Sequence, residues 1–241
     1  MQIHVFENAA QVGQAAATLI AAQVISKPDA VLGLATGSTP IPTYQELIRL
    51  NQAGVVDFSR VRSYNLDEYC SIPEDHEQSY RTFMNVNLFN HINIDKANTH
   101  VPNGNAENAE AESAAYDAAI ATAGGIDVQI LGIGNNGHIG FNEPGDTFIY
   151  GCHQVTLAQS TIEANCRFFD SMDDVPRQAI SLGIGSIMNA RKIILLATGA
   201  GKAKAIYDSV HGDVNPQVQA SILRTHPDVI FLLDKAAASM L

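Results

Sequence analysis

IDVQILGIGNNGHIGFNEPG, residues Ile126–Gly145, is the stretch around which the rest of the chain is organised. Its first half, Asp127–Ile133, is apolar and rich in β-branched residues, which is typical of a buried strand. The strand then breaks into glycines and asparagines, which tolerate left-handed backbone, so we expect a tight loop. That loop carries His138 and Glu143. An imidazole and a carboxylate at the carboxyl end of a strand indicate an acid–base site, and the alternative is a plain turn with two solvated side chains.

Two further strand ends have the features of an anion-binding site. Ala30–Thr36 is an apolar strand that leads into a turn of small residues and then a helix; the turn contains Gly37, Ser38 and Thr39. Such a turn presents backbone N–H groups and hydroxyls to an anion, and the alternative is a helix capped by Ser38 or Thr39 without any ligand. Lys192–Thr198 is a second apolar strand, followed by Gly199-Ala200-Gly201-Lys202. Lys202 is placed to reach a phosphate there, although the spacing is not that of an ATP-binding Walker A loop.

A third strand end is acidic. Val61–Leu66 is predicted as a strand, and Asp67, Glu68 and Tyr69 follow it directly. Two carboxylates at this position would lie in the crevice where an open α/β sheet binds its ligand. One of them could act as a general base, and the alternative is that both cap the next turn.

The composition narrows the class of protein. The chain has 241 residues, 46% of them hydrophobic, and a formal net charge of −11, which argues against nucleic acid or an anionic membrane as a partner. Three widely spaced cysteines, and a beginning unlike a signal peptide, predict a cytoplasmic protein with reduced thiols. Strands alternate with helices without a repeat or long linker. We therefore expect one α/β domain over residues 1–241, with a doubly wound, mostly parallel, Rossmann-like sheet flanked by helices.

Five segments together resemble glucosamine-6-phosphate deaminases, and they are collinear over almost the whole chain. They are LGLATGSTP (Leu32–Pro40), NLDEY (Asn65–Tyr69), GIGNNGHIGFNEPG (Gly132–Gly145), ANCRFF (Ala164–Phe169) and GAGK (Gly199–Lys202). The HIGFNEP core is specific for this family, whereas LATGSTP is shared with 6-phosphogluconolactonases. The resemblance implies the sugar-phosphate isomerase type of the fold. It also implies conversion of glucosamine 6-phosphate and water into fructose 6-phosphate and ammonia, in amino sugar catabolism, without a metal or organic cofactor.

The resemblance also assigns roles to residues of this chain. His138 would open the pyranose ring, Glu143 would orient and tune it, and Asp67 would take the C2 proton and return it at C1. Histidine titrates near neutral pH, which suits a group that both gives and accepts a proton. The substrate phosphate would be held by charge-assisted and backbone hydrogen bonds; the residues implied are Arg167, Lys202 and the turn Gly37, Ser38, Thr39.

Departures from the family pattern carry further expectations. Asn136 stands in the catalytic loop where many members have Asp, so any relay to His138 must rest on Glu143. The segment Phe148–Val155 lacks the Arg and Lys associated with activation by N-acetylglucosamine 6-phosphate. We therefore expect no allosteric activation, and a monomer or small homo-oligomer.

Two other functions fit the same residues. A galactosamine-6-phosphate deaminase/isomerase would use the same machinery and differ only in contacts to the C4 hydroxyl. A non-catalytic sugar-phosphate sensor would share the fold, but it would not need Asp67, His138 and Glu143 together.

Overall fold

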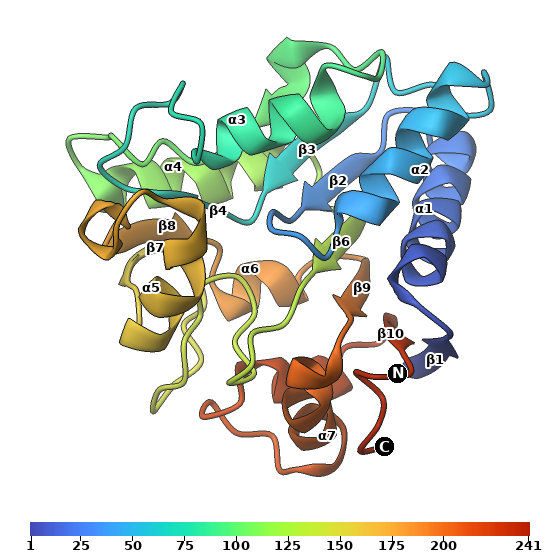
Figure 1. Ribbon diagram of the computed structural model, residues 1–241. Helices are drawn as coiled ribbons and strands as arrows, with labels where there is room; N and C mark the ends of the chain where they lie inside the picture. Colours follow the sequence, from blue (N-terminus) through green and yellow to red (C-terminus); the bar gives the residue numbers. More distant parts are fainter.

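A parallel seven-stranded sheet forms the centre of the protein, shown in Figure 1 as a computed structural model that describes residues 1–241 with the exception of Ser160 and Ala164. Ala164, the first residue of the ANCRFF segment, thus lies outside the described residues. In spatial order the strands are β1 (Gln2–Phe6), β10 (Val229–Asp234), β9 (Lys192–Ala197), β6 (Val128–Leu131), β2 (Val31–Leu34), β3 (Arg62–Asn65) and β5 (Thr99–His100). Every neighbouring pair in this sheet is parallel.

The strand order gives the sheet a switch point between β2 and β6. From β2 the chain continues to β3 and β5 on one side, whereas from β6 it continues to β9 and β10 on the other. The loops that follow β2 and β6 therefore diverge and leave a crevice at the carboxyl edge, where open α/β sheets bind ligands. The predicted doubly wound α/β fold is confirmed, and the main sheet is parallel throughout.

Seven α-helices are found among the described residues. They are α1 (Ala9–Ser26), α2 (Ile41–Gln52), α3 (Tyr80–Met84), α4 (Ala109–Thr122), α5 (Gln159–Asn165), α6 (Ile184–Met188) and α7 (Ala203–His211). Short helical turns cover Asn85–Phe89, Lys96–Asn98, Cys166–Phe168 (η3), Met172–Asp174, Ala200–Lys202 and Gln219–Thr225. The Asn8 side chain accepts a hydrogen bond from Gln11 N at 3.1 Å and so caps α1. In the part of the chain that is described, no helix has the length and apolar character needed to cross a bilayer.

The core lies on both faces of the main sheet, which explains why β2, β6, β9 and β10 are apolar runs rather than alternating strands. At the amino edge the buried Asp127 carboxylate accepts from Lys27 Nζ at 2.7 Å and from Val31 N at 2.8 Å. Arg191 Nη1 donates to its other oxygen at 3.2 Å. These bonds fix the start of β6 beside β2. They therefore hold the two strands together at the amino edge of the sheet, opposite the crevice.

A second, antiparallel sheet stands beside the carboxyl edge of the first. Its strands are β4 (Asp67–Tyr69), β8 (Gln178–Ser181) and β7 (His153–Thr156), with β8 in the middle. A small apolar cluster that includes Tyr69, Phe141 and Ile162 packs it against α5. Asp67 and Glu68, which directly follow the predicted strand Val61–Leu66, thus form a short strand of their own that pairs with β8. A three-residue strand has too short a pattern to be recognised in the sequence.

Candidate active site

The carboxyl edge of the main sheet brings four of the five motif segments together. GAGK follows β9, GIGNNGH follows β6, the ATGST turn follows β2, and NLDEY ends β3. These four strands are consecutive neighbours in the sheet and run parallel. In Figure 1 the arrowheads of β2, β3 and β6 point toward the side on which the small sheet and α5 lie. The motifs are thus neighbours in space although more than 130 residues separate the first from the last.

In the loop after β6, three side chains are joined by hydrogen bonds. Glu143 Oε2 lies 3.2 Å from His138 Nδ1 and accepts a hydrogen bond from Asn136 Nδ2 at 2.8 Å. Asn136 Oδ1 in turn accepts from the His138 backbone N–H at 3.2 Å. An ionised carboxylate can only accept, so the proton of a neutral His138 is held on Nδ1. Its Nε2 is then left with a free lone pair.

The compact path of this loop depends on glycine. A Cβ atom on Gly134 would lie only 2.4 Å from Cε1 of the His138 ring. The backbone here is closed by bonds from Gly134 N to His138 O at 2.9 Å and from Gly137 N to Gly134 O at 3.0 Å. The imidazole therefore folds back over Gly134, and only a residue without a side chain leaves room for it.

Glu143 is held as a carboxylate. Burial by itself would raise its pKa, but hydrogen bonds and the charge of His138 outweigh burial and lower the pKa to about 2. The hydrogen-bonding side chains are His138, Thr161 and Asn136, and Thr161 Oγ1 donates to the second oxygen, Oε1. Glu143 is thus a carboxylate at neutral pH.

Asp67 has the opposite environment. It is only 6% exposed, and burial, followed by the nearby Glu68 charge, raises its pKa to about 8. Among the described residues, no hydrogen bond reaches its carboxyl group. Burial, and after it charges that include that of Asp67, raise the pKa of four tyrosines, which places them near Asp67: Tyr44, Tyr69, Tyr80 and Tyr116. A buried carboxyl group with a pKa near the working pH is poised to exchange a proton.

The small sheet places Asp67 against the loop of His138. Asp67 pairs with Ser181 in the β4–β8 ladder, and Ser181 Oγ accepts from Phe141 N at 3.0 Å. Asp67 Oδ2 lies 3.8 Å from the point that a Cβ on Gly140 would occupy. The acid–base loop and the buried carboxyl group therefore share one crevice, as the sequence predicted.

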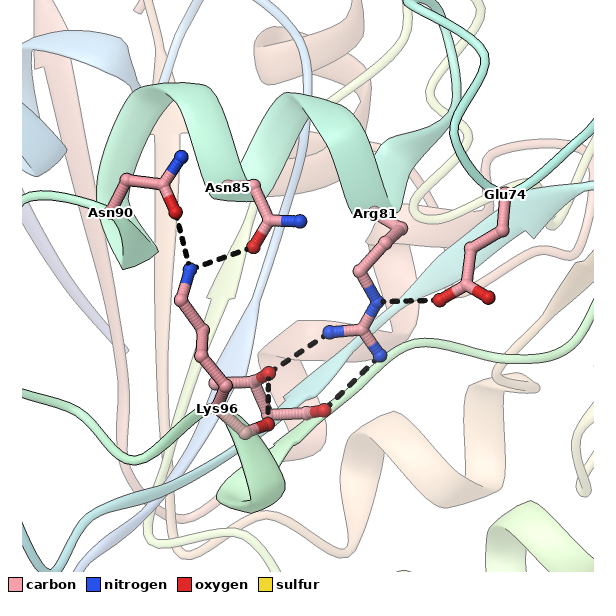
Figure 2. A pocket seen from close by; sticks show the side chains of 6 residues that line it. Glu74, Arg81, Asn85, Asn90 and Lys96 are labelled. Carbon is pink, nitrogen blue, oxygen red and sulfur yellow. Dashed lines mark hydrogen bonds and ion pairs between the residues drawn. The ribbon is translucent and has the colours of Figure 1, made fainter.

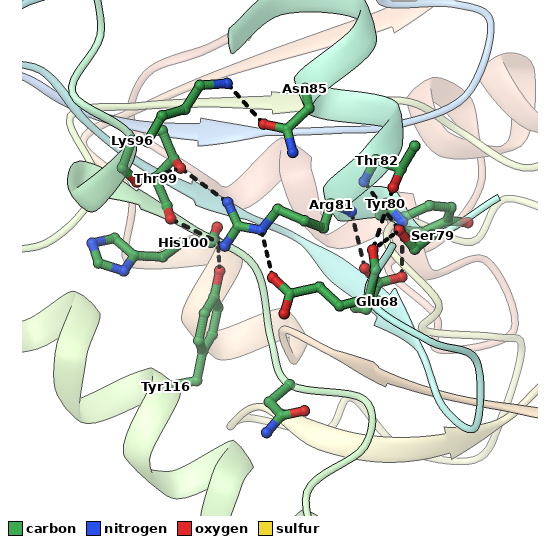
Figure 3. A network of polar contacts seen from close by, with 12 residues as sticks. Glu68, Ser79, Tyr80, Arg81, Thr82, Asn85, Lys96, Thr99, His100 and Tyr116 are labelled. Carbon is green, nitrogen blue, oxygen red and sulfur yellow. Dashed lines mark hydrogen bonds and ion pairs between the residues drawn. The ribbon is translucent and has the colours of Figure 1, made fainter. Parts of the chain in front are cut away.

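Glu68, the second acid of NLDEY, has a structural role. Its carboxylate accepts from the backbone N–H groups of Tyr69 and Tyr80 at 2.9 Å and of Arg81 at 3.0 Å (Figure 3). It therefore caps the first turn of α3. One of the two acids is a cap, as the alternative prediction proposed for both, and Asp67 alone is left free for chemistry.

A hollow of about 480 Å³ lies away from this crevice, between α3 and β5. The cationic side chains that line it already have hydrogen-bond partners. Lys96 Nζ donates to Asn85 Oδ1 at 2.8 Å and to Asn90 Oδ1 at 2.7 Å (Figure 2). Arg81 bonds Thr99 twice and lies 3.3 Å from Glu74. These contacts tie α3 to β5, so we assign the hollow a structural role.

The residues expected to hold phosphate come from three segments. Lys202 follows β9, and burial and then the charge of Arg167 lower its pKa. Arg167, in the turn η3, is therefore close enough to Lys202 for the two cations to repel each other. Gly37 has a φ of 91°, and helix α2 begins after Pro40 without a side-chain cap. The prediction that Ser38 or Thr39 caps this helix is wrong, which leaves both hydroxyls at the helix entrance.

Sequence reasoning missed two parts of the site. Nothing in the sequence marks Thr161, yet its hydroxyl reaches Glu143 across 18 positions. The tyrosines around Asp67 were not expected either, because nothing in their spacing marks them. Among the described residues, no group of three or more His, Cys, Asp or Glu side chains is placed to hold a metal ion.

Comparison with known proteins gives consistent matches over the full length. A glucosamine-6-phosphate deaminase of Clostridium perfringens is 54% identical, with all of both chains covered. One from Clostridioides difficile is 53% identical over all of this chain and 97% of the relative. A solved structure of a monomeric glucosamine-6-phosphate deaminase matches with a TM-score of 0.98 and 42% identity over the whole of both chains.

More distant structures share the fold. A 6-phosphogluconolactonase from Shewanella baltica matches with a TM-score of 0.77 at 20% identity, covering 97% of each chain. The family model for glucosamine-6-phosphate isomerases and 6-phosphogluconolactonases matches residues 6–231. On the combined strength of these matches, the chain belongs to the glucosamine-6-phosphate isomerase/6-phosphogluconolactonase family.

Proposed function

We propose that the protein converts glucosamine 6-phosphate and water into fructose 6-phosphate and ammonia. The observation that carries this proposal is the alignment of four motif segments on four consecutive parallel strands, β9, β6, β2 and β3. This places the acid–base loop between the two turns expected to hold phosphate, with Asp67 at one side. The full-length relatives named as deaminases support the same reaction.

His138 opens the sugar ring in this proposal. With Nδ1 bonded to Glu143, its Nε2 takes the proton from the anomeric hydroxyl and delivers it to the ring oxygen, which yields the open-chain aldehyde. Glu143 stabilises the imidazolium that forms between the two transfers. Because Asn136 carries no charge, it acts through its hydrogen bond to Glu143.

Asp67 then moves a proton from C2 to C1 in this proposal. It removes the C2 proton to give an enolamine and returns the proton at C1. Water adds to the resulting imine carbon and ammonia leaves. The pKa of about 8 means that Asp67 is mostly protonated at neutral pH in the free protein. A cationic amino group on the bound sugar favours the carboxylate, so substrate binding itself releases the base.

Arg167, Lys202 and the turn Gly37, Ser38, Thr39 bind the phosphate. Burial, and then repulsion by Arg167, lower the pKa of Lys202, and a phosphate between the two cations offsets that repulsion. We also propose a single domain over residues 1–241, a cytoplasmic location and a monomer or small homo-oligomer. The solved deaminase of the same fold is itself monomeric, which supports the last of these.

Ammonia release from glucosamine 6-phosphate tests this function, with galactosamine 6-phosphate run in parallel. We expect release from the gluco epimer and none beyond background from the galacto epimer. Release mainly from galactosamine 6-phosphate would retain the mechanism and change the substrate. If neither sugar releases ammonia while both bind, the protein is a sensor and the proposed reaction is wrong.

A further inference from the structure

Thr161 connects helix α5 to the loop after β6 that holds His138 and Glu143. It lies in α5, is 6% exposed, and its Oγ1 donates to Oε1 of Glu143. The other oxygen of Glu143 faces His138 and Asn136, both of which belong to the same loop as Glu143. Thr161 is thus the donor to this carboxylate that comes from a different segment.

The threonine hydroxyl fixes the orientation of the carboxylate. A carboxylate that is bonded through one oxygen only can rotate about its last side-chain bond. With Oε1 held by Thr161, Oε2 is directed at His138 Nδ1. A displacement of α5 would therefore change the hydrogen bond that sets the tautomer and basicity of His138.

The same segment leads to the proposed phosphate site and contacts the strand of Asp67. Six residues after Thr161 the chain reaches Arg167, in the turn η3 that directly continues α5. Between them, Asn165 Nδ2 donates to the Tyr69 hydroxyl at 2.9 Å, and Tyr69 is two residues from Asp67. A ligand that draws Arg167 toward Lys202 consequently acts on a segment whose other end holds Glu143.

We propose that Thr161 is a positioning residue that couples occupancy of the phosphate site to the protonation of His138. Phosphate bound by Arg167 and Lys202 fixes α5, and Thr161 transmits this to Glu143 and so to the imidazole. A bound phosphorylated sugar thereby reinforces the hydrogen bonds that already join Thr161, Glu143 and His138. This inference rests on the proposed function, since it takes the phosphate site and His138 as parts of one reaction.

The test compares Thr161→Val, which keeps the shape and removes the hydroxyl, with Thr161→Ser, which keeps the hydroxyl. The pKa of His138 is measured by NMR titration in each full-length variant, with and without saturating inorganic phosphate. In the wild type and in Thr161→Ser we expect phosphate to shift the His138 pKa. In Thr161→Val we expect most of that shift to be lost, while phosphate still binds.

Turnover of glucosamine 6-phosphate supplies the second measurement. We expect Thr161→Val to lower kcat about tenfold, with KM changed little, and Thr161→Ser to restore most of kcat, because a lost bond to a charged group has effects of this size. An equal phosphate-induced shift in Thr161→Val and the wild type would mean that phosphate acts on His138 directly, and the coupling would be refuted. Absence of any shift in the wild type would refute it as well. The titration does not depend on turnover, so failure of the deaminase proposal would be seen separately, as absent ammonia release by the wild type.

Discussion

Two carboxyl groups in one crevice have opposite environments. Glu143, in the loop after β6, is surrounded by three hydrogen-bonding side chains, and its pKa falls to about 2. Asp67, on β4, is more deeply buried and has tyrosines and a like charge around it, and its pKa rises to about 8. Both are acidic side chains at the carboxyl edge of the same sheet. At Glu143 the hydrogen-bond donors and the charge of His138 outweigh burial, whereas Asp67 is more deeply buried and, among the described residues, no donor reaches its carboxyl group.

The difference assigns the two roles. A group that remains charged at all working pH values can orient and stabilise a neighbour but cannot exchange protons. A group whose pKa lies near the working pH can accept a proton and give it back. This contrast supports the proposal that Glu143 assists His138 and that Asp67 carries the proton transfer between carbons. Four predictions follow from this contrast.

Replacing the Asp67 carboxyl group, which exchanges the proton, should have the largest effect on kcat. Asp67→Asn keeps the shape of the side chain but cannot accept a proton from C2. We expect kcat for ammonia release from glucosamine 6-phosphate to fall at least about 1,000-fold, within the range of general-base catalysis. Binding of fructose 6-phosphate, measured by calorimetry, serves as the control and should persist. If the variant keeps a tenth or more of its kcat, Asp67 is not the base.

Neutralising Glu143 should lower kcat less than the Asp67→Asn substitution does. Glu143→Gln leaves a side chain that can still bond His138 but no longer stabilises the imidazolium. We expect kcat to fall about 100-fold, and the pKa of His138, followed by NMR, to decrease. The contrast with Asp67→Asn would disappear if both variants lost activity equally and the His138 pKa did not move.

The raised pKa of Asp67 also predicts a gain in stability on substitution. The folded protein keeps this proton up to about pH 8, whereas an unfolded Asp loses it near pH 4, so the wild type loses stability as the pH rises between these values. Asn does not titrate. Asp67→Asn should therefore raise Tm by at least about 4 °C at pH 8.5 and by little at pH 4.

Calorimetric unfolding at the two pH values measures this difference in Tm. Glu143→Gln provides a control of opposite sign, because the ionised Glu143 stabilises the fold above about pH 4.5 and loses that effect as the pH falls toward 2. A pH-independent change in Tm for Asp67→Asn would show that the Asp67 carboxyl group is not protonated in the folded state.

The smallest effect is expected for Asn136→Asp. The change replaces a donor to Glu143 with a second carboxylate, which raises the pKa of Glu143 by repulsion and that of His138 by attraction. We expect kcat to change less than about tenfold, with the pH optimum displaced upward. A larger loss would mean that the Asn136 hydrogen bond matters as much to His138 as Glu143 does.

The sequence predicted which elements carry several residues of the proposed site. The apolar run before Gly132 and the glycines after it sufficed to place His138 and Glu143 in a loop at a strand end. The same reasoning placed Gly37–Thr39 and Gly199–Lys202 at the ends of two further strands. These features are local, since a strand and the turn after it are specified by residues that follow one another in the chain.

The chain by itself thus determined which elements form and which side chains stand at their ends, because hydrophobic periodicity and turn residues act over a few positions. Only the tertiary structure decided what state each acid is in. Glu68 becomes a cap because Tyr80 and Arg81 turn toward it, and Glu143 is charged because His138, Thr161 and Asn136 all reach it, Thr161 from 18 positions away. Asp67 faces the loop of His138 because β4 pairs with β8, more than 100 residues later. Burial and hydrogen bonding depend on all that surrounds a group, and those neighbours are assembled only when the chain folds.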